Sequence, residues 1–167
     1  MNYMKDVKTI VLCGFGMALT FVLTAFIAIP IGQFGYINLG DLSVMLFASI
    51  LSPSLAFLVG GIGSALADLY LGYSQYALFT LLIKGIEGFL VAYLFSTLKS
   101  KKILAYIVSV PIVALGYCLA DTILLQSFIT AASGIPFNVL QSGASMALAM
   151  IASKVFIKQA TLNFLHK

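Results

Sequence analysis

Long stretches without a charged residue divide the chain into apolar segments that are separated by short breaks. Residues 9–40 carry no charge and are interrupted by Pro30 and Gly32, and residues 42–67 are again uncharged but contain a Ser-Pro-Ser break at 52–54. A helix needs about 20 residues to cross the hydrocarbon core of a bilayer. The pattern predicts six helices, at about 7–29, 41–51, 54–71, 77–98, 103–127 and 138–162.

The second predicted helix differs from the others in length. At a rise of 1.5 Å per residue, residues 41–51 reach only about 16 Å, which is too short to span a bilayer. We expect this helix to be tilted or partly re-entrant and to pack on its neighbours. Residues 30–40 and the breaker-rich residues 130–136 are expected to form loops. The whole chain, 1–167, is predicted to be one membrane domain.

Composition agrees with a chain that lies inside a membrane. Hydrophobic residues make up 62% of the sequence and charged residues 8%, and the mean hydropathy is +1.11. A soluble domain is about 25% charged, so too few polar groups are present to cover a soluble surface. These values predict an all-α integral membrane protein. They exclude a soluble enzyme, a nucleic-acid-binding domain and a disordered chain.

Lysines supply the net charge of +4, and their positions predict an orientation. Connecting segments on the cytoplasmic side of membrane proteins carry an excess of basic residues. Six helices with a cytoplasmic N-terminus and a cytoplasmic C-terminus place eight of the nine lysines at or near that side, while the connections at about 30–40, 72–76 and 128–137 contain none. The eight are Lys5, Lys8, Lys99, Lys101, Lys102, Lys154, Lys158 and Lys167.

Apart from the lysines near the cytoplasmic side, five ionisable residues fall inside the predicted helices, all in the half that faces outward: Asp41, Asp68, Lys84, Glu87 and Asp121. Such residues are costly within a membrane and usually functional. A proton relay or a channel would distribute polar groups through the full thickness of the bilayer. The one-sided distribution instead predicts a pocket that is open to the outside and closed toward the cytoplasm.

Amide and aromatic side chains share this outer layer and extend the predicted pocket, since a small-ligand site combines flat apolar walls with a few polar groups. The predicted ligand-binding residues are Asn38, Asp41, Asp68, Tyr73, Tyr76, Lys84, Glu87, Tyr117, Asp121, Asn138 and Gln141. Gln75, Gln126 and Ser142 lie in the same layer.

Simpler interpretations remain open for several of these residues. Lys84 and Glu87, three positions apart on one helix face, suit a simple intrahelical ion pair. Asp41 follows Gly40 and suits the N-cap of the second helix. Asp68 can end its helix without touching a ligand, and the tyrosines suit an interfacial belt. No catalytic residue, metal site or cofactor is expected, because the sequence has no buried His, no cluster of metal ligands and no Ser or Cys beside a base.

Three segments of the sequence carry a family resemblance: Ile37-Asn38-Leu39-Gly40-Asp41, residues 60–68 (GGIGSALAD) and Lys84-Gly85-Ile86-Glu87-Gly88. Together they resemble the substrate-binding S components of energy-coupling factor (ECF) vitamin transporters. The pattern is most similar to the branch that contains riboflavin, hydroxymethylpyrimidine and pyridoxine carriers. The resemblance implies an S-component fold and a multi-pass protein of the bacterial cytoplasmic membrane.

The resemblance also implies partners. Such S components capture a vitamin from outside with high affinity, associate with an EcfT-type transmembrane coupling subunit and two cytoplasmic ATPases, and are thought to topple in the membrane. A small-residue face on the first helix contacts the coupling subunit, and here Gly14, Ala18 and Val22 occupy that place. The loop at 30–40 corresponds to the family's gate. The chain has no ATP-binding motif and no expected nucleic-acid partner.

The charged residues of the predicted outer layer indicate what kind of ligand the pocket can bind. One cation and up to four carboxylates would repel a polyanion, so a small neutral or weakly basic aromatic ring is favoured, of the pyridoxine or hydroxymethylpyrimidine kind. Riboflavin, pantothenate or another vitamin remains an alternative. A stand-alone secondary transporter or channel, and a membrane enzyme, are competing interpretations.

Overall fold

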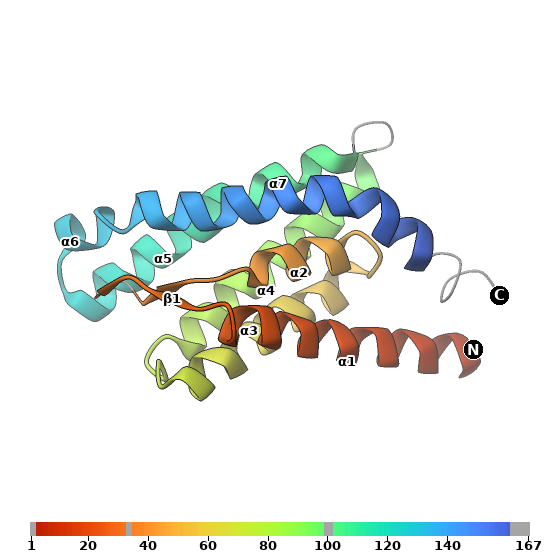
Figure 1. Ribbon diagram of the computed structural model, residues 1–167, viewed down its shortest axis with the longest axis horizontal. Coiled ribbons are helices and arrows are strands. Elements are labelled where there is room, and N and C mark those ends of the chain that lie inside the picture. Colours follow the sequence, from red (N-terminus) through yellow and green to blue (C-terminus); the bar gives the residue numbers. More distant parts are fainter. Residues whose placement is uncertain (1–2, 33–34, 99–101, 161–167) are drawn as a thin grey trace.

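The computed structural model describes residues 3–32, 35–98 and 102–160, and these form a bundle of helices that lie along one long axis (Figure 1). Five helical segments in this part of the chain are long and apolar enough to cross a membrane. They are Val7–Ala25, Pro53–Leu71, Ala77–Thr97, Ile103–Leu125 and Phe128–Gln159. The predicted all-α membrane class is confirmed.

Ten elements make up the described chain. They are, in order, α1 (Tyr3–Ala25), β1 (Ile29–Pro30), β2 (Tyr36–Ile37), α2 (Gly40–Ala48), α3 (Pro53–Leu71), α4 (Ala77–Thr97), the 3₁₀ helix η2 (Lys102–Val108), α5 (Ser109–Leu125), α6 (Phe128–Ala132) and α7 (Ile135–Ala160). The helix predicted at 103–127 begins as the 3₁₀ helix η2 and becomes α-helical at Ser109. The other long helices differ from the prediction by a few residues at their ends. The last residues of the predicted sixth helix, 161–162, lie outside the described residues.

The first helix ends at Ala25 and not at 29, because the chain turns into a small antiparallel hairpin. Ile29 pairs with Ile37 and Pro30 with Tyr36. Proline has no N–H to donate within a helix and disfavours a helical residue before it, so the helix cannot continue through this segment. The hairpin covers one end of the bundle, beside the start of α2 (Figure 1).

The segment predicted as a loop at 130–136 is largely helical, so that prediction was wrong. The Ser127 side chain caps α6 by accepting a hydrogen bond from the Thr130 N–H at 3.3 Å. Pro136 lies in the first turn of α7, where no helix carbonyl needs the N–H that proline lacks. Proline therefore starts a helix here and does not break one.

Helix α2 is short and almost entirely enclosed. Eight of its nine residues are buried, and it packs against α1, α3, α4 and α7. Figure 1 shows it between α7 and α1 near the centre of the bundle. Because the longer helices surround it, α2 does not need to span the bilayer, as expected from its length.

Helices α3 and α4 approach each other closely along a face of small residues. A Cβ atom on Gly61 would lie 2.6 Å from the carbonyl oxygen of Leu81, and one on Gly60 would collide with the carbonyl oxygen of Lys84. Such contacts let helix backbones pack tightly in lipid. The small-residue face of α3 therefore serves internal packing.

The start of α1 and the end of α7 lie at one end of the bundle, while the hairpin, the α3–α4 turn and α6 lie at the other (Figure 1). Lys8, Lys154 and Lys158 belong to the first end, as the distribution of lysines predicts. Lys99, Lys101 and Lys167 lie outside the described residues. Which end faces the cytoplasm remains a prediction.

We expect Gly60→Ala to destabilise the bundle by about 1–3 kcal/mol, because the added methyl group overpacks the contact with the α4 backbone. Thermal unfolding of the purified protein in detergent measures the change. Gly143→Ala on α7 is the matched control, since nothing lies within 4 Å of its Cβ position. Equal melting temperatures for Gly60→Ala and the unmodified protein would contradict the packing.

We expect Ser74→Cys, between α3 and α4, to react with a membrane-impermeant maleimide on intact cells. Ser96→Cys, at the opposite end of α4, should react only after permeabilisation. Both positions are exposed, and the natural Cys13 and Cys118 are buried, which limits background labelling. The reverse pattern would invert the predicted orientation.

Candidate ligand-binding site

A partly open cavity lies at the hairpin end of the bundle, with about 350 Å³ of empty space that includes open solvent. The walls of the cavity come from segments that are far apart in the sequence. For example, Asn38, which follows β2, donates a hydrogen bond to Gln141 of α7. The lining residues are Gly35, Tyr36, Asn38, Asp68, Tyr73, Tyr76, Thr80, Tyr117, Asn138 and Gln141. The cavity is therefore a product of the tertiary fold and not of one motif.

Four tyrosines give the cavity flat aromatic surfaces. The ring centroids of Tyr36 and Tyr73 are 5.1 Å apart, and those of Tyr73 and Tyr76 are 6.4 Å apart. The Lys84 ammonium lies 5.4 Å from the centroid of the Tyr117 ring, and the Tyr117 hydroxyl lies 3.1 Å from Thr80 Oγ1. Such walls suit an aromatic ligand ring.

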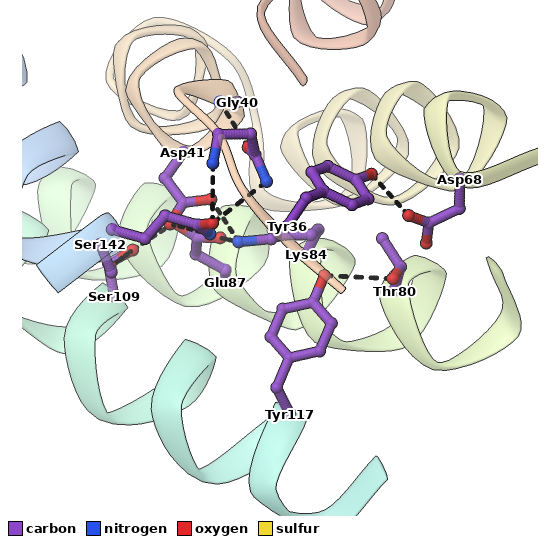
Figure 2. Close-up of polar contacts among 12 residues, drawn as sticks. Tyr36, Gly40, Asp41, Asp68, Thr80, Lys84, Glu87, Ser109, Tyr117 and Ser142 are labelled. Carbon is purple, nitrogen blue, oxygen red and sulfur yellow. Dashed lines mark hydrogen bonds and ion pairs between the residues drawn. The ribbon is translucent and has the colours of Figure 1, made fainter. Parts of the chain in front are cut away.

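Asp68 is a carboxylate with one oxygen left open. The Tyr36 hydroxyl donates to Asp68 Oδ1 at 2.6 Å, and burial together with the charge of Asp68 raises the pKa of Tyr36, so the hydroxyl stays protonated. Asp68 Oδ2 is buried and has no hydrogen-bond partner within the described residues, although Thr80 lies beside it. Figure 2 shows Asp68 on one side of Tyr36 and the Lys84 cluster on the other. A buried acceptor of this kind is open to a hydrogen-bond donor from outside the chain.

Two amide side chains form the opposite part of the lining. The Asn38 backbone N–H and side-chain Nδ2 both donate to Gln141 Oε1, at 3.0 and 3.1 Å. Asn38 Oδ1 accepts the N–H of Gly40 at 2.8 Å, and Gln141 Nε2 donates to Asp41 Oδ2 at 3.4 Å. These bonds join the segment after β2 to α2 and α7.

Gln141 leads through Asp41 to a buried ion cluster, and Figure 2 shows its members Asp41, Lys84 and Glu87 close together. Lys84 of α4 pairs with Asp41 of α2 and, at 3.6 Å, with Glu87 one turn along its own helix. The Ser109 hydroxyl donates to Glu87, and the Ser142 hydroxyl donates to that of Ser109 at 3.3 Å. The three charged side chains are at most 2% exposed, and none of them lines the cavity. The cluster closes off the space beneath the cavity and joins four helices.

Asp121 has a supporting position. It is buried on α5, accepts a hydrogen bond from the Tyr76 hydroxyl at 2.7 Å, and does not line the cavity. It thereby holds one of the aromatic walls in place.

The structure brings the predicted residues into one region but in two layers. Seven line the cavity: Asn38, Asp68, Tyr73, Tyr76, Tyr117, Asn138 and Gln141. The other four, Asp41, Lys84, Glu87 and Asp121, lie behind the lining. Ligand contact by any of the eleven remains a prediction.

Two simpler interpretations do not hold. Leu39 and not Asp41 is the N-cap of α2, and Asp41 uses its side chain for Lys84. Lys84 and Glu87 are more than an intrahelical pair, because Asp41 joins them from another helix.

Sequence reasoning also misplaced or missed several side chains. Gln75 and Gln126 are exposed and do not line the cavity. Tyr36 and Thr80 line the cavity but were not predicted. The four-residue spacing of Thr80 and Lys84 places both on one face of α4 and could have indicated Thr80. No sequence signal distinguishes Tyr36 from an interfacial tyrosine.

The described residues contain no group of three or more His, Cys, Asp or Glu side chains that could hold a metal ion. The chemistry available in the cavity is that of binding: aromatic surfaces, amide donors and one open carboxylate oxygen.

Comparison with known proteins identifies the family. Residues 4–158 match the family model described as "ECF-type riboflavin transporter, S component". The "Thiamine precursor transporter HmpT" of Lactococcus lactis subsp. cremoris is 29% identical over 165 residues, which cover 98% of this chain and 96% of that protein. A Pyrococcus woesei protein named "Uncharacterized protein in gap 3'region" is 51% identical over 67 residues, 40% of this chain and 44% of that protein.

The family match extends over nearly all of the described helical bundle, including every residue that lines the cavity. The chain is accordingly a multi-pass membrane transport component and not an enzyme, and it belongs to the family of ECF-type riboflavin transporter S components.

Proposed function

We propose that this chain is the substrate-binding subunit of an ECF-type ABC importer and captures a vitamin or vitamin precursor with a single aromatic ring, of the pyridoxine or hydroxymethylpyrimidine kind. The observation that carries the proposal is the cavity at one end of the bundle, lined by tyrosines and amides and closed beneath by an ion cluster. The thiamine precursor transporter of Lactococcus, similar over nearly the whole chain, supports a cargo of this size.

The dimensions and charge of the cavity support a small ligand that is neutral or weakly basic. The cavity is small, because its empty space of about 350 Å³ includes open solvent and the enclosed part is smaller still. Asp68 is the charged residue of the described lining, and Lys84 lies behind it in contact with Asp41 and Glu87. A polyanion would therefore meet a carboxylate and no available cation.

Riboflavin is the main alternative cargo, because the family model carries its name. Its three fused rings need more room than one ring does, and the cavity volume favours the smaller ligand. Pantothenate has no ring to place against the four tyrosines.

The closed base of the cavity supports delivery by movement of the whole subunit. Lys84, Asp41 and Glu87 occupy the space between α2 and α4, with Ser109 of α5 against them. A stand-alone secondary transporter would need a polar path that continues toward the other end. In our proposal, toppling of the subunit on its partners carries the bound vitamin inward.

The exposed face of α1 supports a partner in the membrane. Gly14, Ala18 and Val22 are all exposed, and nothing lies within 4 Å of the Cβ position of Gly14. Small residues at this spacing let a second helix approach closely. We assign this face to an EcfT-type coupling subunit, which two cytoplasmic ATPases would drive.

We expect purified, ligand-stripped protein to bind one compound from a panel of pyridoxine, hydroxymethylpyrimidine, riboflavin and pantothenate with nanomolar affinity. Isothermal titration calorimetry measures the affinity and stoichiometry. In liposomes the chain alone should not concentrate that compound, because its family relies on partner subunits. Ion-gradient-driven uptake by the chain alone would instead establish the stand-alone transporter.

We expect Gly14→Leu and Ala18→Leu to leave vitamin affinity unchanged and to reduce co-purification of the coupling subunit, because a large side chain prevents close helix approach. Ala144→Leu is the matched control, since Ala144 is equally exposed but lies on α7. Normal co-purification of the α1 variants, or an equal loss with Ala144→Leu, would refute the assigned face.

A further inference from the structure

Two amide side chains present hydrogen-bond donors in one part of the cavity, and a carboxylate presents an acceptor in another part. Asn38 and Gln141 provide the amide part, and Asp68 provides the carboxylate part, on the far side of Tyr36 from the ion cluster (Figure 2). A ligand that satisfies both parts must carry groups of the complementary kind.

The amide part offers hydrogen-bond donors, because neighbouring groups determine where the oxygen and the nitrogen of each side-chain amide point. The Asn38 backbone N–H can only donate, so it requires the oxygen of Gln141, and the nitrogen of Gln141 is then left for the Asp41 carboxylate. The Gly40 N–H likewise requires the oxygen of Asn38. Each amide nitrogen carries two hydrogens and uses one of them in these bonds. One N–H of each side chain therefore remains for a ligand acceptor.

The carboxylate part offers an acceptor. Tyr36 donates to Asp68 Oδ1, which leaves Oδ2 without a hydrogen-bond partner, and Asp68 is only 3% exposed. Among the described residues no lysine forms an ion pair with Asp68, because Lys84 pairs with Asp41 and Glu87. A buried carboxylate oxygen without a donor costs free energy until a ligand supplies one.

We propose that Asp68 determines ligand specificity by accepting a hydrogen bond from an exocyclic amino group on a single nitrogen-containing ring. The free N–H groups of Asn38 and Gln141 bond a ring nitrogen or hydroxyl oxygen of the same ligand, and the tyrosines flank its ring. The ligand class is an aminated nitrogen heterocycle such as an aminopyrimidine. This inference rests on the proposed function and narrows the cargo within it.

Removal of the exocyclic amino group from the ligand is the chemical change that should weaken binding to this cavity most. A ring of the same shape without that group fills the cavity but leaves Asp68 Oδ2 unpaired. A site built around a hydrogen bond rejects an analogue that lacks the donor far more strongly than an apolar pocket rejects a missing methylene. We expect discrimination of about tenfold or more.

The test compares two probes, 4-amino-5-hydroxymethyl-2-methylpyrimidine and the same compound without its 4-amino group, by calorimetric titration of the full chain in detergent. The unmodified protein should bind the amino compound about tenfold or more tightly than the other. Asp68→Asn should bring this ratio close to one, because the neutral amide has a single oxygen, which the Tyr36 hydroxyl already uses. A ratio measured within one variant does not depend on how much of that variant is folded.

Ser64→Ala is the matched control. Ser64 is buried on α3 one turn before Asp68, its hydroxyl has no hydrogen-bond partner within the described residues, and it does not line the cavity. This variant should keep the ratio of the unmodified protein.

Equal affinity of the unmodified protein for the two probes would overturn the proposal, as would an unchanged ratio in Asp68→Asn. Tight binding of pyridoxine without binding of either pyrimidine would also overturn it and leave the proposed function standing. Tight binding of riboflavin or pantothenate would overturn both this inference and the single-ring cargo of the proposed function, but not the role of a vitamin-binding subunit. Binding of none of these compounds would remove the proposed function itself.

Discussion

A lysine buried within a membrane protein must be paired, and the pairing of Lys84 organises this molecule. Burial of an isolated ammonium group is too costly to persist, so Lys84 requires carboxylates on neighbouring segments. Asp41 supplies one from α2 and Glu87 supplies the other. Because α2 is only nine residues long, it cannot be held by spanning the bilayer, and this ion pair joins it to α4 in the interior. The cluster thereby determines where the chain re-enters the bundle after the hairpin.

The position of the cavity follows from the position of α2. Asp41 accepts from Gln141, and Gln141 accepts from Asn38, so hydrogen bonds lead from the ion cluster to the cavity lining. The segment after the hairpin is held over the end of the bundle by these bonds. Polar groups of the cavity lining are thus supported by charges that lie behind the lining. In our proposal, this arrangement separates the residues that hold the fold from those that recognise the ligand.

Close packing of α3 on α4 gives the other wall its geometry. Glycines on α3 bring the two backbones into contact, which places Asp68 of α3 beside Thr80 of α4 and opposite Tyr36. Apolar attraction alone does not hold helices together in lipid, so small-residue contacts and buried polar groups carry this packing. The shape of the cavity therefore depends on two kinds of interaction, the glycine contacts on one side and the ion cluster on the other.

The sequence by itself determined the membrane class, the long helices and the set of intramembrane charges, because hydrocarbon imposes length and polarity rules that act on each segment separately. It could not show that Pro136 begins a helix or that Pro30 belongs to a hairpin, since proline suits both a helix start and a break. Only the tertiary structure decided which charges line the cavity. Asp68 lines the cavity while Asp41, Glu87 and Asp121 take partners from distant segments. The depth of a residue in the membrane can be inferred from its position along a predicted helix. The partner of a buried charge, however, depends on which helices pack together.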